Sequence, residues 1–274
     1  MTRRAPWMTH VFLLAGGIAW LYPFLWTLGS SLKSTDEFFG RGLNPLPGTP
    51  LWSNYGQAWQ GASFGQYFVN TLTITVCTVV ITLLVTAMAG YTLARTEFPG
   101  KGLVLVAVAG TVFLPHGYTI IPIFDIMDAL GLLNSLWSII IVQSAGGIVF
   151  GTFLFMGYFR AIDRSLEDAA RVDGANFHQV FWRIMLPLSG PMLATVGLFT
   201  AISAWNSFFI PLVFTLARPE LRTLGVGMYA FIGENSTDWT LLCAGSVITL
   251  APIIAIFLVL QRFFVNGLAG AVKQ

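Results

Sequence analysis

Charged residues are scarce in this sequence. Asp, Glu, Lys and Arg together make up 9% of the 274 residues, whereas they are about a quarter of an ordinary soluble protein. Apolar residues make up 55% and aromatic residues 14%. A chain with so little charge cannot cover a water-facing surface, so the composition predicts a protein embedded in a lipid bilayer, with no nucleic-acid partner.

Motifs that carry chemistry are also missing. The chain contains no phosphate-binding loop of the form G-x-x-x-x-G-K-[ST], no HExxH pair for zinc and no CxxC pair. Its two cysteines, Cys77 and Cys243, lie in apolar stretches, where they act as small apolar residues rather than as a disulfide. The sequence therefore predicts neither an enzyme nor a protein with a metal or cofactor of its own.

Six stretches of about twenty residues or more contain no Asp, Glu, Lys or Arg. Each is long enough to cross a bilayer as a helix, which needs about 20 apolar residues. The sequence therefore predicts an all-α integral membrane protein, with six transmembrane helices in one domain of residues 1–274. The expected spans are residues 8–32, 67–94, 102–123, 136–159, 188–217 and 239–261.

The spans contain no Asp, Glu, Lys or Arg, whereas proton- and ion-coupled carriers usually place ionisable groups within the membrane. A secondary transporter is therefore the weaker of two transport hypotheses, the other being a subunit that another protein drives.

The basic residues predict the orientation. With an even number of spans both termini lie on one side, and a cytoplasmic N-terminus puts ten of the fourteen Lys and Arg residues inside. Loop Lys and Arg are enriched on the cytoplasmic side of membrane proteins. We therefore expect cytoplasmic termini and a cytoplasmic loop over residues 160–187.

This loop contains most of the main polar segment between the apolar runs, which covers residues 164–191. Its first part predicts a short amphipathic helix, in which Ser165 caps the N-terminus. Leu166, Ala169 and Ala170 fall on one face of that helix.

A turn and a second helix are expected next. Gly174 suits the left-handed position that ends a helix. Asn176 can cap a second helix together with Gln179, and apolar residues follow at helical spacing until Pro187 interrupts. Two helical pieces joined by a tight turn offer a compact apolar knob with charged flanks.

The segment resembles the EAA loop of permease subunits in bacterial binding-protein-dependent ABC importers. Asp168, Ala169 and Ala170 stand at the E-A-A positions, Gly174 at the glycine, and Ile184, Leu186 and Pro187 at the I-x-L-P end. In that family the loop helix, called a coupling helix, docks into a cleft on a separate ATPase subunit. The resemblance implies ATPase-coupling residues at Glu167, Asp168, Ala169, Ala170, Asp173, Gly174, Ala175, Leu186 and Pro187, with Asp168 in place of the family's Glu.

Other segments resemble the carbohydrate-uptake branch of these permeases, the MalG type. They are AWNSFFIPL in the fifth expected span, the Arg-Thr-Leu of residues 222–224 and the terminal GLAGAVK. The resemblance implies a multi-pass subunit of a bacterial inner-membrane complex. Its partners would be a MalF-type second permease, two ATPase subunits that hold ATP and Mg, an extracytoplasmic sugar-binding protein and a sugar substrate. A permease for another solute, such as glycerol phosphate, shares these features and stays open.

Polar residues inside the spans are candidates for the substrate pathway. Trp205, Asn206 and Ser207 lie together in the fifth expected span. A tryptophan face there can stack on a sugar ring while an amide bonds its hydroxyls. Asn70 in the second span and Gln143 in the fourth also need polar partners within the membrane. For these residues helix packing is the alternative to substrate contact.

Overall fold

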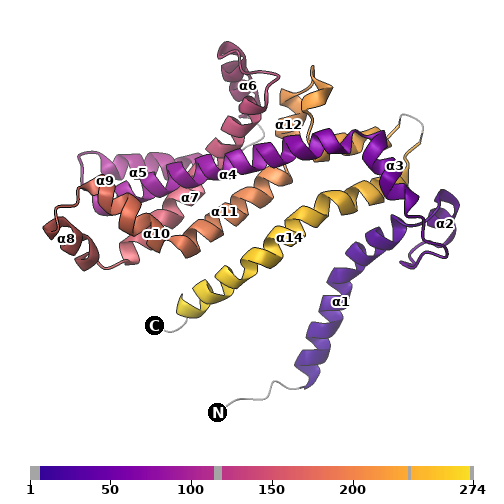
Figure 1. Cartoon of the computed structure of the whole chain (residues 1–274), viewed down its shortest axis with the longest axis horizontal. Coiled ribbons are helices and arrows are strands. Elements are labelled where there is room, and N and C mark those ends of the chain that lie inside the picture. The colour runs from indigo at the N-terminus through magenta and orange to yellow at the C-terminus, as the bar shows by residue number, and fades with distance from the viewer. Residues whose placement is uncertain (1–6, 114–118, 234–235, 272–274) are drawn as a thin grey trace. The chain divides into compact units, whose positions relative to one another are not determined.

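The computed structural model describes residues 7–113, 119–233 and 236–271, and for residues 259–271 only the path of the backbone. The described part is built from helices and loops, with one isolated antiparallel β-bridge between Ile232 and Thr237 (Figure 1). The all-α prediction is therefore confirmed. The chain divides into two compact units, and a single domain over residues 1–274 remains a prediction.

The first unit combines the N-terminal region with residues 227–252. Its elements are α1 (Trp7–Ser30), α2 (Thr35–Gly40), α3 (Ser53–Gly61), the 3-10 turn η4 (Met228–Phe231) and the first part of α14 (Trp239–Ala271). Asn54 of α3 fixes the chain just after α1, because its side-chain amide donates hydrogen bonds of 2.9 Å to the carbonyl oxygens of Ser31 and Lys33. The most apolar 18-residue window of α1 has no buried residue.

The second unit is a helical bundle. Its elements are α4 (Phe64–Arg95), α5 (Lys101–Gly110) with the 3-10 turn η1 (Thr111–Phe113), α6 (Ile120–Ala129), α7 (Leu136–Ala161), α8 (Ser165–Val172), α9 (Phe177–Val180), the π-helix η2 (Phe181–Met185), α10 (Leu186–Leu188), α11 (Gly190–Trp205), α12 (Phe209–Phe214), the 3-10 turn η3 (Pro219–Leu221) and α13 (Leu224–Gly227). Helices α4, α7 and α11 lie side by side, with α8 and α9 at one end and α6 and α12 toward the other (Figure 1).

Apolar length decides which helices can cross a bilayer. Four helices in the described part are long and apolar enough, and a bent pair made of residues 177–188 and 190–205 would be a fifth. The third expected span, residues 102–123, is a shorter apolar helix as far as Phe113, and residues 114–118 within it lie outside the described part. Six spans therefore remain a prediction.

The fifth expected span is not one continuous helix. Helix α11 ends at Trp205, and α12 begins only at Phe209. Pro211 has no N–H to donate to the carbonyl of Ser207, and its ring clashes with that carbonyl in a regular helix. The apolar run continues through residues 206–208, so hydropathy alone did not reveal the break.

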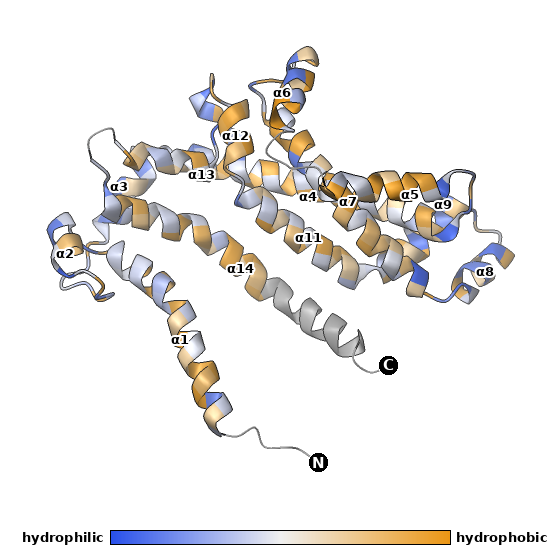
Figure 2. Ribbon diagram, turned by 180° about the vertical axis from the view of Figure 1, so that it is seen from behind, coloured by the Kyte–Doolittle hydropathy of each residue, from blue (hydrophilic) through white to orange (hydrophobic). Residues whose placement is uncertain are grey.

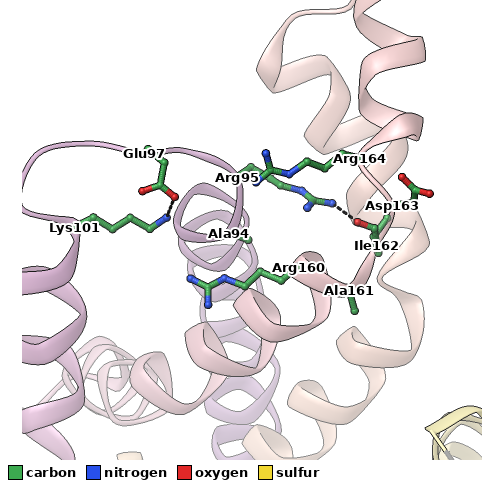
Figure 3. Close-up of a pocket in the computed structure, with 9 residues that line it drawn as sticks. All are labelled: Ala94, Arg95, Glu97, Lys101, Arg160, Ala161, Ile162, Asp163 and Arg164. Atoms are coloured by element: carbon green, nitrogen blue, oxygen red, sulfur yellow. Dashed lines mark hydrogen bonds and ion pairs between the residues drawn. The ribbon is translucent and has the colours of Figure 1, made fainter. Parts of the chain in front are cut away.

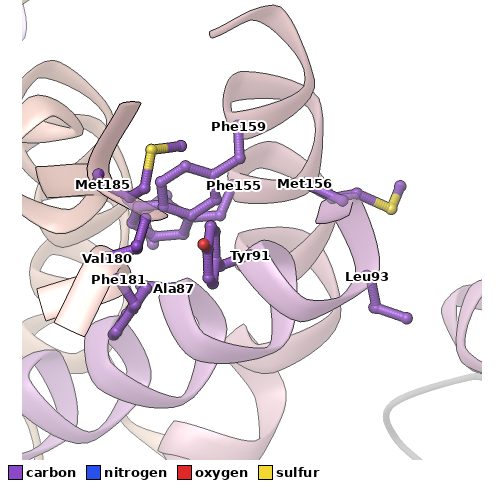
Figure 4. Close-up of a cluster of buried hydrophobic side chains, with 12 residues drawn as sticks. Ala87, Tyr91, Leu93, Phe155, Met156, Phe159, Val180, Phe181 and Met185 are labelled. Carbon is purple, nitrogen blue, oxygen red and sulfur yellow. The ribbon is translucent and has the colours of Figure 1, made fainter. Parts of the chain in front are cut away.

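Glycine allows α4 and α7 to approach closely. A Cβ added at Gly90 of α4 would lie 2.6 Å from the Cβ of Phe155 and 3.0 Å from the backbone oxygen of Thr152, both on α7. Next to this contact lies the main cluster of buried apolar side chains, in which Tyr91, Phe155 and Phe159 are at most 1% exposed (Figure 4). The two helices are therefore packed backbone to backbone at the end of the bundle that carries α8.

Gly90→Ala is expected to lower the stability of the folded chain by about 1–3 kcal/mol, because the added methyl forces α4 and α7 apart. Thermal unfolding of the detergent-solubilised protein measures the change. Gly157→Ala, on α7, is the matched control, since a Cβ there meets nothing within 4 Å. Equal melting temperatures for the two variants would contradict the close approach.

Candidate functional site

Helix α8 begins one residue earlier than the sequence indicates. Ser165 is its first residue, and the backbone N–H of Ser165 donates a 2.9 Å hydrogen bond to Oδ1 of Asp163. The predicted cap at Ser165 is therefore wrong: Arg164 holds the N-cap position without a side-chain cap hydrogen bond, and the carboxylate of Asp163 accepts from the first helical N–H. The hydrogen bond from Ser165 holds the pKa of the Asp163 carboxyl below its usual value, which keeps a negative charge at the N-terminal end of α8.

The buried face of α8 carries a carboxylate. Glu167 is 2% exposed and Ala170 is 9% exposed. Leu166 and Ala169, which the sequence groups with Ala170 on one apolar face, are exposed, whereas Ala170 is buried. The structure therefore divides that predicted face, because the carboxylate of Glu167 on α8 pairs with a buried cation of the bundle.

This cation is Arg95, at the end of α4. Its Nε forms an ion pair of 2.5 Å with Oε1 of Glu167, and the two side chains are 4% and 3% exposed. The hydroxyl of Tyr91, one turn earlier on α4, donates to Oε2 of Glu167 at 3.2 Å. A terminal nitrogen of Arg95 donates a 2.7 Å bond to the carbonyl of Ile162, just before α8. We call these three side chains, Tyr91, Arg95 and Glu167, the buried ion-pair cluster.

The cluster contains the two residues that the sequence reasoning missed. Arg95 was counted only among the ten basic residues expected in cytoplasmic segments, and Tyr91 was not among the candidate residues. The sequence distance between Arg95 and Glu167 is large, and no local pattern links them. The only sequence signal for this cluster was a tyrosine, Tyr91, near the end of an apolar span, with Arg95 four residues later.

Acidic and apolar side chains on the other face of α8 point away from the bundle. The Asp168 side chain is 69% exposed, and Val172 is 88% exposed. Leu166 is 47% exposed. An eight-residue helix thus carries an exposed face of mixed character, while its opposite face is held by an ion pair. Figure 2 shows the mixture of hydrophilic and hydrophobic residues on α8.

The turn and the second helical piece follow the sequence prediction. Gly174 has φ +85°, in the left-handed region. The side chain of Asn176 accepts from the backbone N–H of Gln179 at 2.9 Å, and the Gln179 side chain accepts from the backbone N–H of Asn176 at 2.9 Å. This reciprocal pair is a capping box, as predicted. Asp173 is exposed beside the turn, and the N–H of Ala175 closes it by donating to the carbonyl of Ala170 at 2.9 Å.

Pro187 does not end the second helix where expected. The chain passes through the π-helix η2, in which the N–H of Leu186 donates to the carbonyl of Phe181, and the helix continues as far as Leu188. It then bends by 76° at Ser189 into α11. The wider π turn accommodates a proline without an N–H in the next turn.

An aromatic group joins this second piece to α4. The ring of Tyr91 lies 4.7 Å from the ring of Phe177 and 5.3 Å from that of Phe181, measured between centroids. Phe159 of α7 packs edge-on against Tyr91 at 5.5 Å. Figure 4 shows Phe181, Phe159 and Tyr91 within one cluster. Tyr91 therefore contacts both halves of the 160–187 loop, through its hydroxyl and through its ring.

A basic hollow of about 600 Å³ lies beside the cluster (Figure 3). Cationic side chains line it from α4, α5, the end of α7 and the residue before α8, and these are Arg95, Lys101, Arg160 and Arg164. Lys101 is paired with Glu97 at 2.8 Å, and this hydrogen bond lowers the pKa of the Glu97 carboxyl. The concentration of cations at this end of the apolar helices is what a cytoplasmic face requires.

The structure separates the five substrate-pathway candidates. Gln143 and Ser207 line one cavity of about 400 Å³ between α4, α7 and α11. Asn206 is exposed just after α11. Trp205 is 1% exposed and packs edge-on against Phe68 at 5.8 Å. Asn70 is 3% exposed, and its amide donates to the carbonyl oxygens of Glu220 and Arg222 at 2.8 and 2.9 Å.

Known proteins resemble the chain over nearly its whole length. A family model described as "Binding-protein-dependent transport system inner membrane component" matches residues 67–270. The chain is 40% identical over 265 residues to the probable ABC transporter permease protein YurM of Bacillus subtilis, which covers 96% of this chain and 87% of YurM. It is 32% identical over 273 residues to the diacetylchitobiose uptake system permease protein NgcG of Streptomyces coelicolor, with 99% and 89% covered.

A solved structure has the same fold. One chain of a bacterial ABC transporter that imports the acidic polysaccharide alginate matches with a TM-score of 0.85 and 28% identity, over 96% of this chain and 100% of that chain. The fold and the loop geometry thus define a permease of the ABC importer type. The chain belongs to the family of binding-protein-dependent transport system inner membrane components.

Arg95→Met is expected to destabilise the protein by about 3–5 kcal/mol, because it leaves the carboxylate of Glu167 buried without its cation. Chemical unfolding in detergent measures the loss. The double variant Arg95→Met with Glu167→Gln should recover much of it, since no buried charge remains.

Arg171→Met is the matched control, because Arg171 also faces Glu167, at 3.8 Å, but its side chain is 53% exposed. An exposed partner of this kind contributes at most about 1 kcal/mol. A loss for Arg95→Met no larger than for Arg171→Met would mean that the buried ion pair does not hold α8.

Proposed function

We propose that this chain is one of two permease subunits in an ATP-driven sugar importer of a bacterial inner membrane. It forms half of the translocation pathway, and its 164–187 loop receives movement from a separate ATPase. The observation that carries the proposal is the two-faced helix α8. One face is fixed to α4 through Glu167, and the other presents Leu166, Asp168 and Val172 to the outside.

The exposed face of α8 suits docking to another protein. A helix of eight residues is not stable alone in water, so its position depends on the buried ion-pair cluster and on the turn at Gly174. Exposed Leu166 and Val172 offer apolar contact at the end of the bundle where the cations gather. Asp168 stands at the first E-A-A position, and its exposed carboxylate, which lies 3.7 Å from Arg171, can also pair with a cation of the ATPase.

The remaining partners follow from the family. A binding protein delivers the sugar from outside the membrane, and two ATPase subunits hold ATP and Mg, since this chain has no phosphate-binding loop. A second permease completes the pathway. The apolar surface of α1, which this chain does not bury, supports contact with lipid and with that second permease.

Movement of α8 would reach the spans by two routes. One route passes through the capping box, η2 and the bend at Ser189 to α11. The other passes through Glu167 and Arg95 directly to α4. Because α8 cannot shift without breaking a buried charge pair or carrying α4 with it, the second route makes α4 part of the coupling. Switching between inward- and outward-facing states then requires that nucleotide and binding protein favour different states.

A permease for another solute, such as glycerol phosphate, is the second candidate. Names of relatives favour sugars: NgcG is named for diacetylchitobiose. A secondary transporter is disfavoured by the family membership and by expected spans without Asp, Glu, Lys or Arg. Uptake by proteoliposomes that contain the complete complex decides among them. Sugar uptake that needs ATP inside and binding protein outside is the expected result, and uptake by this chain alone would contradict the proposal.

Val172→Glu is expected to reduce ATPase activity stimulated by the binding protein, and sugar uptake with it, about tenfold or more. The reason is that a desolvated charge in an apolar contact costs well over 1.4 kcal/mol. Val172→Met, which keeps the surface apolar, is the matched control. Both variants should fold alike, because Val172 is 88% exposed. Full activity of Val172→Glu would place the ATPase contact elsewhere.

A further inference from the structure

The cavity of about 400 Å³ between α4, α7 and α11 holds polar groups that the protein itself does not satisfy. The amide oxygen and the amide nitrogen of Gln143 are both buried, and neither has a hydrogen-bond partner among the described residues. The hydroxyl of Thr78, on α4, is buried and unpaired in the same way. Both residues line the cavity. A buried amide without partners is costly, so groups of this kind indicate that something polar belongs in the space.

The lining has the composition of a sugar-binding surface. Hydroxyl-bearing residues face it from α11 and from the break after it, and these are Thr200, Ser203 and Ser207. Phe150 and Phe199 line it as well, in an edge-to-face pair with centroids 6.0 Å apart. Sites that bind small organic molecules combine such apolar walls with a few placed polar groups.

Charge is absent from this surface. None of the described residues that line the cavity is Asp, Glu, Lys, Arg or His. An anionic solute would enter it without a counter-charge, which is strongly unfavourable in a membrane interior. The lining therefore selects for uncharged groups that both donate and accept hydrogen bonds.

We infer that this cavity is a subsite for the hydroxyl groups of a neutral sugar, with Gln143 as its principal specificity-determining residue. The amide of Gln143 donates to one hydroxyl and accepts from another, and Thr78 bonds a third group nearby. This inference rests on the proposed function as a permease. It assigns substrate contact to this subunit itself. It also predicts that the cavity accepts neutral sugars and disfavours glycerol phosphate and acidic oligosaccharides.

Uptake by the complete complex in proteoliposomes tests the inference. The probes are labelled diacetylchitobiose, melibiose, raffinose and maltose, with glycerol phosphate and an alginate oligosaccharide as charged competitors. Wild-type uptake of a neutral sugar is expected, and Gln143→Leu should lower its rate at limiting sugar about fivefold, the factor for one lost hydrogen bond.

A second variant reduces the volume of the cavity instead of the polarity of its lining. Gly146 lines the cavity, and a Cβ there meets nothing within 4 Å. Gly146→Val should therefore fit the fold and lower uptake by filling the space. Gly157→Val on the same helix, also with nothing within 4 Å, is the control. Ser144→Ala is the control for Gln143→Leu, since the Ser144 hydroxyl bonds its own helix at Ile140 and does not line the cavity.

The decisive readout is selectivity among deoxy analogues of the transported sugar. Wild-type complex should take up at least one deoxy analogue about fivefold more slowly, and Gln143→Leu should abolish that difference, because the amide that read the hydroxyl is gone. A purely structural role of Gln143 would leave the ratio unchanged and would overturn the inference. Preferred uptake of a charged competitor would overturn it as well.

Two further outcomes are distinct. If Gln143→Leu no longer copurifies with the second permease, the cavity is a subunit contact and the inference is wrong, although the proposed function stands. If the wild-type complex moves none of the probes under ATP, the proposed function as a sugar importer fails, and the subsite fails with it.

Discussion

A single buried charge pair determines how the loop end of this protein is organised. Two ions that leave water are tolerated only when they meet each other in good geometry. Glu167 meets this condition at Arg95, with the Tyr91 hydroxyl on its other oxygen. Helix α8, which is too short to persist alone, therefore has one orientation with respect to α4. Because Glu167 faces inward, the side chains on the opposite face of α8 point outward.

Helices α4, α7 and α11 are packed more closely at one end of the bundle than at the other. Beside the ion-pair cluster α4 and α7 approach through Gly90, and the space between them is filled by aromatic rings. Further along, α4, α7 and α11 enclose a cavity with unpaired polar atoms. The closely packed end of the bundle is thus the end that contacts the loop, and the cavity that suits a solute lies further along. A movement of the loop reaches the closely packed end before it reaches the cavity.

Much of this architecture can be predicted from the sequence, for physical reasons. Spans without charge must be helices in a bilayer, so the first, second, fourth and sixth expected spans agree with α1, α4, α7 and α14 to within a few residues at most of their ends. Gly174 and the Asn176–Gln179 pair are local signals, because their geometry depends on neighbours in the chain.

Other features depend on contacts between distant residues, and the sequence did not reveal them. Helical spacing does not show which face of α8 turns inward, and Glu167 is inward because Arg95 lies opposite, more than seventy positions away in the chain. The break after Trp205 lies in an apolar run whose hydropathy stays high. Of the five pathway candidates, Gln143 and Ser207 share a cavity, whereas the Asn70 amide is engaged by backbone carbonyls. Polarity within a span identified all five residues, but only the fold shows which of them have partners.

Helices α4 and α7 carry Asp, Glu, Lys or Arg only near their C-terminal ends. Arg95 closes α4, and Arg160 is the penultimate residue of α7. A conformational switch that rocks these helices therefore displaces almost no charge along the membrane normal. Voltage acts on a protein in proportion to the charge it moves, at about 2.3 kcal/mol per elementary charge per 100 mV. The resting potential of the cell accordingly does little work on a rocking movement of α4 and α7.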